Sequence, residues 1–167
     1  MMIHKTSIIA EAGVNHNGDI NMALELVDKA AESGADYVKF QTFDSKNLAT
    51  KLVSKARYQK KTTDANENQF DMLQKLQLTI EQNEQIIKHC SKRKIKFLSS
   101  AFDQGSLNLL VENFNQNEIK FGSGELTNAP LLLAAARSKV KIILSTGMSS
   151  LTEVEEALGE LAFGMCQ

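Results

Sequence analysis

The sequence predicts an α/β fold in which strands and helices alternate along the chain. Five short apolar runs rich in β-branched residues are each followed by a polar or glycine-rich turn, as expected of buried strands. Segments with helical periodicity lie between them, and this alternation is typical of a parallel sheet covered by helices on both faces. The predicted strands are residues 8–13, 37–42, 95–100, 119–122 and 141–146.

Helix signals fill the segments between the predicted strands. Residues 23–30 and 154–162 place apolar side chains on one face at helical spacing. Thr79 and Ser150 each stand three residues before a Gln or Glu, which is the capping-box pattern of a helix start. Pro130 falls in the first turn of another helix, where its missing N–H costs little.

The connection between the second and third strands is unusually long. About sixty residues separate the starts of these two strands, whereas the other units are compact. The insertion holds a basic stretch, residues 51–61, and an extra amphipathic helix, residues 70–76. It is either a lid over a site or a solvated loop with a packing helix.

The composition is typical of one globular domain with a net charge close to zero. Lys and Arg number 19 against 20 Asp and Glu in 167 residues, so the net charge is −1 and offers no basic footprint for nucleic acid or an anionic membrane. No apolar run reaches the roughly 18 residues of a membrane span, and no signal peptide is evident, so we expect a cytoplasmic protein. Cys90 and Cys166 lack C-x-x-C spacing, which predicts neither zinc site nor disulfide.

Three predicted strands carry a charge near their carboxyl ends, where ligands bind in parallel α/β folds. These residues are Glu11, Lys39 and Lys120. Burying an unpaired ion costs several kcal/mol, so each charge needs a partner. Lys39 and Gln41 have the i, i+2 spacing that sends both to one face. Two converging lysines indicate an anion between them; the alternative is that they pair with Glu11 or reach water.

The ends of three strands also supply small residues and hydroxyls, among them Ser100, Ser123 and Ser145. Glycines there let the backbone approach a ligand, and N–H groups with hydroxyls form an anion nest. This pattern predicts a phosphorylated or carboxylated small molecule. Glu125 is a candidate for contact with a sugar hydroxyl or for proton transfer. The alternative is that its carboxylate only stabilises the start of the helix that follows. We interpret His16 as a hydrogen-bonding loop residue and assign no metal ligand.

Five strand-end motifs resemble those of the N-acetylneuraminic acid (sialic acid) synthases in order and spacing. They are AEAGVNHNG (10–18), GADYVKFQT (34–42), FLSSAF (97–102), KFGSGE (120–125) and ILSTGM (143–148). The resemblance implies a (β/α)8 TIM barrel that condenses phosphoenolpyruvate with an N-acetylated amino sugar and releases phosphate. It also implies a divalent metal, Mn²⁺ or Mg²⁺, and a homodimer. The neuraminate and legionaminate branches match better than the pseudaminate branch.

The resemblance assigns roles to individual residues. Glu11 matches a first-strand glutamate near the metal and the reacting carbons, so it is the catalytic candidate. Glu125 and Asn66 match positions that contact the acceptor sugar. Ser100 stands where many relatives have threonine, so the hydroxyl is kept, and Ala101 stands where many have proline. The positions that match phosphoenolpyruvate contacts are Lys39, Gln41, Ser100, Lys120, Ser123 and Ser145.

The chain offers about five of the eight βα units of such a barrel, which takes about 250 residues. We therefore expect residues 1–167 to be the N-terminal part of the barrel, without the family's two metal-binding histidines and its C-terminal antifreeze-like domain. Two other functions stay open. One is a non-catalytic remnant that at most binds an anion, and the other is an aldolase that uses Lys39 or Lys120 as a Schiff-base nucleophile.

Overall fold

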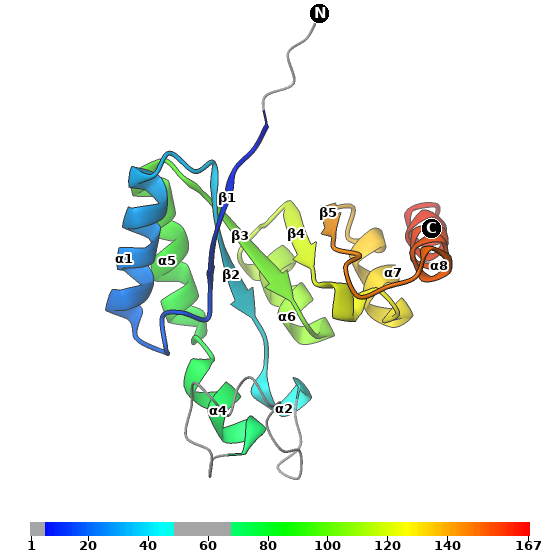
Figure 1. Cartoon of the computed structure of the whole chain (residues 1–167), viewed down its shortest axis with the longest axis horizontal. Helices are drawn as coiled ribbons and strands as arrows, with labels where there is room; N and C mark the ends of the chain where they lie inside the picture. Colours follow the sequence, from blue (N-terminus) through cyan, green and yellow to red (C-terminus); the bar gives the residue numbers. More distant parts are fainter. Residues whose placement is uncertain (1–5, 49–67) are drawn as a thin grey trace, which may run out of the picture. The chain divides into compact units, whose positions relative to one another are not determined.

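The computed structural model describes residues 6–48 and 68–167 (Figure 1). Within these residues five strands form one sheet in the order β1-β2-β3-β4-β5, so each strand lies beside its successor in the chain. The recorded pairings are parallel, and helices connect the strands. This confirms the predicted α/β class. The strands are β1 (Ile9–Gly13), β2 (Tyr37–Thr42), β3 (Lys96–Ala101), β4 (Glu118–Phe121) and β5 (Lys141–Leu144).

The helices follow the strands in alternation. None of the described helices is long and apolar enough to cross a membrane. The α-helices are α1 (Ile20–Glu32), α2 (Ser45–Leu48), α4 (Gln69–Leu76), α5 (Ile80–Arg93), α6 (Gln104–Asn108), α7 (Ala129–Arg137) and α8 (Leu151–Met165). A π-helical turn, η1 (Leu109–Asn113), and a 3-10 turn, η2 (Ser123–Glu125), complete the set.

The described residues fall into two compact units. The first comprises the described parts of Met1–Gln41 and Lys75–Leu98, and the second those of Thr42–Gln74 and Ser99–Gln167. In the first unit, α1 and α5 lie side by side against β1 and β2 (Figure 1). Its core holds the fully buried side chain of Phe40, which stacks on Phe97 with ring centroids 5.9 Å apart.

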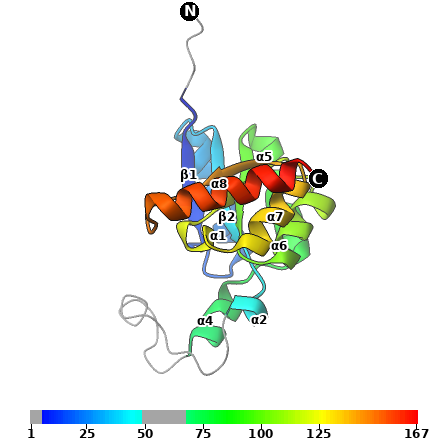
Figure 2. The same ribbon diagram turned by 90° about the vertical axis from the view of Figure 1, so that its right-hand side faces the viewer.

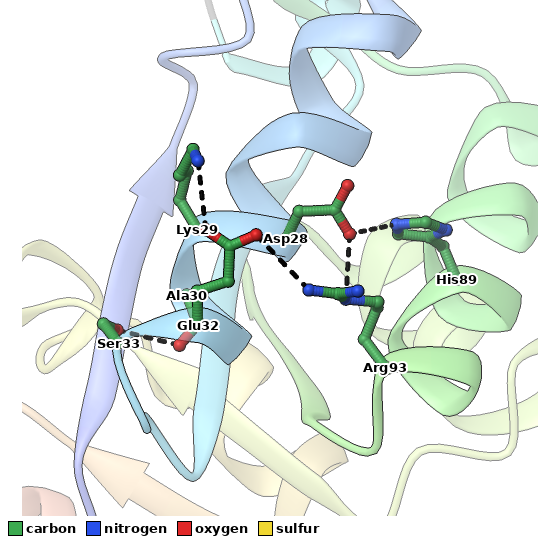
Figure 3. A network of polar contacts seen from close by, with 7 residues as sticks. All are labelled: Asp28, Lys29, Ala30, Glu32, Ser33, His89 and Arg93. Carbon is green, nitrogen blue, oxygen red and sulfur yellow. Dashed lines mark hydrogen bonds and ion pairs between the residues drawn. The ribbon is translucent and has the colours of Figure 1, made fainter.

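Ion pairs join the last turns of α1 and α5 on the outer surface of the first unit (Figure 3). Asp28 Oδ1 lies 2.7 Å from His89 Nε2 and 3.1 Å from Arg93 Nε. Arg93 also reaches Glu32, with Nη2 and Oε1 3.5 Å apart. These side chains are partly exposed to solvent, so each pair contributes at most about 1 kcal/mol. The network therefore contributes little to the free energy that holds the two helices together.

In the second unit, α7 and α8 pack along each other (Figure 2). A Cβ at Gly164 would lie 2.6 Å from the Ala136 Cβ, closer than real side chains approach. Glycine therefore allows the helices their short separation. The core of this unit includes Phe121 of β4 and Leu132 of α7, both fully buried.

The local helix signals are confirmed. Thr79 and Ser150 each form both hydrogen bonds of a capping box, at the starts of α5 and α8. Pro130 lies in the first turn of α7, which Asn128 caps. The extra amphipathic helix of the insertion is α4. The basic stretch 51–61 lies outside the described residues.

Two features differ from the sequence prediction. Only β2 and β3 are buried along nearly their whole length, whereas β1 and β5 are partly exposed because each has one neighbouring strand in the described sheet. The alternation implies a helix between β3 and β4 but gives it no bounds, and the π-turn η1 that follows α6 there was not predicted. A π-turn shifts the hydrogen bonds to i→i+5, so the apolar side chains lose the 3.6-residue period that identifies a helix.

The two cysteines have different surroundings. Both are free thiols; Cys90 is a buried residue of α5, and Cys166 is exposed at the end of α8. Burial raises the pKa of the Cys90 thiol to about 12, which leaves it protonated at neutral pH.

Gly18 and Gly34 form a matched pair for a stability test. Both have left-handed backbones, with φ of +79° and +78°. A Cβ at Gly18 would lie 2.2 Å from the Lys75 carbonyl oxygen, whereas a Cβ at Gly34 would meet nothing within 4 Å. We expect Gly34→Ala to lower the free energy of unfolding by about 1 kcal/mol, the cost of the left-handed backbone alone. Gly18→Ala should cost about 1 kcal/mol more. Urea unfolding measures both, and equal losses would contradict the close approach.

Candidate functional site

Three predicted site residues come together in the first unit. Glu11 of β1 pairs in register with Lys39 of β2. Lys39 Nζ lies 2.7 Å from Glu11 Oε2 and 3.0 Å from Oε1, so both carboxylate oxygens contact the ammonium group. Lys39 is 9% exposed, and the Glu11 side chain is 55% exposed. The structure thus shows the ion pair that the sequence left open, with the carboxylate on the solvent side.

Gly13 brings Gln41 to the same place. The backbone of Gly13 is left-handed, with φ of +55°, and the β1–β2 register shifts between Glu11 and Gly13. A Cβ on Gly13 would lie 3.2 Å from Glu11 Oε1 and 3.8 Å from Gln41 Nε2. The two side chains therefore converge over the bare Cα of Gly13. Carboxylate, ammonium and amide groups share one small region at the carboxyl ends of these strands.

Three further predicted residues come together in the second unit. Ser100 of β3 pairs in register with Lys120 of β4. Lys120 Nζ donates to Ser145 Oγ at 2.5 Å and to the Phe121 carbonyl at 2.7 Å. Ser145 directly follows β5, and Ser100 is 3% exposed. A cation and two hydroxyls on adjacent strand ends suit a phosphate or carboxylate oxygen.

The turn after β4 carries Ser123 and Glu125. Both lie in η2, where the Glu125 backbone N–H donates to the Gly122 carbonyl at 3.0 Å. Glu125 Oε2 accepts a hydrogen bond from Asn128 Nδ2 at 2.8 Å, and Asn128 caps α7. The structure therefore ties Glu125 to the start of a helix, which is one of the three interpretations that the sequence left open. Asn66 lies outside the described residues.

His16 is fully buried in the loop after β1. Its Nδ1 accepts the Gly18 backbone N–H at 3.0 Å, so the neutral ring carries its proton on Nε2. The ring lies near Phe40, with centroids 6.1 Å apart, and Nε2 has no partner among the described residues. Burial lowers the pKa of this imidazole. His16 thus holds the loop that follows Glu11.

We expect stability to reflect this lowered pKa. His16 binds its proton more weakly in the folded than in the unfolded state, so its contribution is complete above pH 6.5 and is lost as pH falls through the folded pKa. The variant His16→Asn keeps an acceptor for Gly18 and removes the titration. Urea unfolding from pH 8 to pH 5 should show a steeper acid loss in the wild type. Parallel curves for the two proteins would contradict a buried neutral histidine.

The described residues do not fit the divalent metal that the family resemblance implies. In residues 6–48 and 68–167 no three His, Cys, Asp or Glu side chains gather where they could hold an ion. Glu11 contacts Lys39, and His16 Nδ1 is engaged by Gly18.

Sequence reasoning missed Asp103, whose carboxylate accepts four hydrogen bonds near these strand ends. Its carboxylate accepts hydrogen bonds from Ser106 in α6, from Asp44 in the loop after β2, and from Asn47 in α2. An Asp before a helix is a recognisable cap. The contact with a loop 59 residues away in the sequence leaves no local signal.

Comparisons with known proteins agree with this architecture. A model of the NeuB family matches residues 26–166. The N,N'-diacetyllegionaminic acid synthase of Campylobacter jejuni is 52% identical over 94% of this chain and 47% of its own length. The synthase of the same name from Legionella pneumophila is 45% identical over 90% of this chain and 42% of its own length.

A solved structure shows the same fold. The N-acetylneuraminic acid (sialic acid) synthetase of Leptospira borgpetersenii, in complex with citrate, superposes with a TM-score of 0.80 at 28% identity. The match covers 96% of this chain and 52% of that one. The chain thus spans about half the length of the curated relatives it matches.

Proposed function

Because the chain belongs to the NeuB family, we propose that it supplies the phosphoenolpyruvate-binding part of a nonulosonic acid synthase. This enzyme, a transferase, condenses phosphoenolpyruvate with an N-acetylated amino sugar and releases phosphate. The two relatives named above are both N,N'-diacetyllegionaminic acid synthases, and they favour N,N'-diacetyllegionaminic acid as the product. The acceptor would then be the diacetamido sugar aldehyde that remains when the three-carbon pyruvate unit is removed from it.

The hydrogen bond between Lys120 and Ser145 is the observation that carries this proposal. The family resemblance assigns both residues to phosphoenolpyruvate, and Lys120 Nζ reaches Ser145 Oγ from the neighbouring strand. Ser100 lies beside Lys120 on the other side. A phosphate or carboxylate oxygen would replace the serine as acceptor and receive hydrogen bonds from both hydroxyls. Charge-assisted contacts of this kind contribute about 1.5–3 kcal/mol each.

On the family resemblance alone, we assign the Glu11–Lys39 pair to phosphoenolpyruvate as well. Carbon 3 of phosphoenolpyruvate forms a bond to the aldehyde carbon of the sugar, and the aldehyde oxygen takes up a proton to become a hydroxyl. Water adds at carbon 2 and gives up one proton. Phosphate then leaves with cleavage of the bond between carbon 2 and its oxygen, taking the second proton of the water, and carbon 2 becomes a ketone. Glu11 provides a carboxylate for the proton that the added water gives up. Lys39 and the Gln41 amide orient the carboxylate of the substrate, while Lys39 holds Glu11 in place. Glu125 and Asn66 are assigned to the acceptor sugar.

The test is release of phosphate from phosphoenolpyruvate that depends on the amino sugar. Because the relatives are about twice as long, the assay uses both the chain alone and a fusion that supplies the rest of the barrel from the Campylobacter relative. Borohydride trapping with substrate separates the aldolase alternative, because a Schiff base leaves a reduced lysine adduct. Such an adduct on Lys39 or Lys120, or failure of the fusion to release phosphate, would contradict the synthase assignment.

A further inference from the structure

Three successive contacts fasten the end of β2 to the end of β3 within the second unit. We refer to them as the β2–β3 clamp: Thr42 with Ser99, Phe43 with Phe102, and Asp44 with Asp103. Thr42 Oγ1 and Ser99 Oγ lie 2.8 Å apart, and both residues are buried. Phe43 and Phe102 meet edge to face with ring centroids 6.4 Å apart. Each pair joins the two chain segments at the point where their strands end.

Asp103 makes the outermost contact of the clamp and also caps α6. Its Oδ1 accepts the Ser106 backbone N–H at 2.9 Å, and its Oδ2 accepts the Ser106 hydroxyl at 2.6 Å. From the segment after β2, Oδ2 accepts a hydrogen bond from the Asp44 backbone N–H at 3.1 Å. Oδ1 accepts a hydrogen bond from Asn47 Nδ2 at 3.3 Å. Two of the four bonds belong to the cap of α6, and the other two reach the segment after β2, at Asp44 in the loop and Asn47 in α2.

The space and charge at Asp103 suit this arrangement. A Cβ at position 105 would lie 3.1 Å from Asp103 Oδ1, so Gly105 leaves room for the carboxylate. Burial by itself would raise the pKa of Asp103. The hydrogen bonds from Ser106, Asp44 and Asn47 outweigh that effect and lower the pKa. Asp103 is therefore ionised at neutral pH, when its acceptors are strongest.

The clamp lies next to the predicted phosphate contacts along both strands. Ser99 and Ser100 are consecutive in β3, so their side chains point to opposite faces. Fixing Ser99 on one face fixes Ser100 on the other, where it pairs in register with Lys120. Thr42 likewise follows Gln41 in β2. Movement of the clamp would therefore displace the hydroxyl that stands beside Lys120.

We propose that Asp103 is a positioning residue for phosphoenolpyruvate binding: by holding the loop after β2, it keeps Ser100 aligned with Lys120 and Ser145. This inference rests on the proposed function. Asp103 itself does not touch the substrate. Its effect passes through the clamp to the strand end.

The variant Asp103→Asn separates the two roles of the side chain. Asparagine caps helices as well as aspartate and keeps an acceptor for the Ser106 N–H. Its single carbonyl oxygen cannot also serve Asp44, Asn47 and the Ser106 hydroxyl. The matched control is Asp19→Asn at the cap of α1, where the recorded side-chain contact is local, to the Asn21 N–H. A milder second variant, Asn47→Ala, removes one donor of the segment after β2 and leaves Asp103 intact.

Two measurements on the 167-residue chain test the proposal: hydrogen exchange of the Asp44 amide and calorimetric affinity for phosphoenolpyruvate. In Asp103→Asn we expect at least about tenfold faster exchange at Asp44 and about tenfold weaker binding. Asn47→Ala should change both in the same direction by less, and Asp19→Asn should change neither. Faster exchange with unchanged affinity would overturn the positioning role alone. Absence of binding by the wild-type chain would instead overturn the proposed function, and this inference with it.

Discussion

Replacing Glu11 with glutamine is expected to lower turnover at least about 100-fold while phosphoenolpyruvate still binds. Glutamine keeps the shape of the side chain and removes the negative charge that Lys39 Nζ contacts at 2.7 Å. The carboxylate is then lost as a base, whereas Lys39 keeps its charge for the anionic substrate. Affinity should be unchanged or tighter, because the substrate no longer competes with Glu11. Phosphate release by the fusion measures turnover, and calorimetry measures binding.

A second cross-strand pair provides the control for Glu11. Glu118 and Lys141 pair at the starts of β4 and β5, with Oε1 and Nζ 2.6 Å apart. These residues lie at the amino ends of their strands, away from the ends where ligands bind. Glu118→Gln should leave turnover within about twofold of the wild type. If Glu11→Gln behaves in the same way, Glu11 is only a structural partner of Lys39.

Replacing Lys120 with alanine should weaken phosphoenolpyruvate binding about 10- to 100-fold, the loss of one charge-assisted contact. The Ser145 hydroxyl loses its recorded donor at the same time. In steady-state kinetics the KM for phosphoenolpyruvate should rise far more than that for the amino sugar, because Lys120 is assigned to only one substrate.

The matched control for Lys120 is Lys141→Ala. Lys141 lies on the neighbouring strand, and its ammonium group is paired with Glu118. We expect no change in either KM. An equal rise of both KM values in Lys120→Ala would show general damage to the fold and would contradict the phosphate assignment.

The sequence predicts the parts of this fold that depend on neighbouring residues. Capping by Thr79 and Ser150 involves side chains three residues apart, so the pattern is readable before folding. Runs of consecutive apolar residues likewise predict the strands. The π-turn η1 was missed because its hydrogen-bond pattern breaks the helical period within five residues.

The sequence identifies which residues belong to the candidate site but not which of them contact each other. Strand-end position and residue type identify Glu11, Lys39 and Lys120 as a set. They do not say that Lys39 contacts Glu11 whereas Lys120 contacts Ser145, because those choices depend on strand register across 28 and 25 residues. Asp103 was missed for the same reason, since its partner Asp44 belongs to a different loop.

Because the two thiols differ in burial, the chain can be labelled selectively at one of them. Alkylating reagents react with thiolates, and at pH 8 a group with the pKa of Cys90, about 12, is ionised at only about one part in ten thousand. Cys166 is exposed to solvent, and the whole sequence contains no third cysteine. A maleimide dye should therefore mark the end of α8 without mutagenesis, and would give a fluorescent reporter on the native chain.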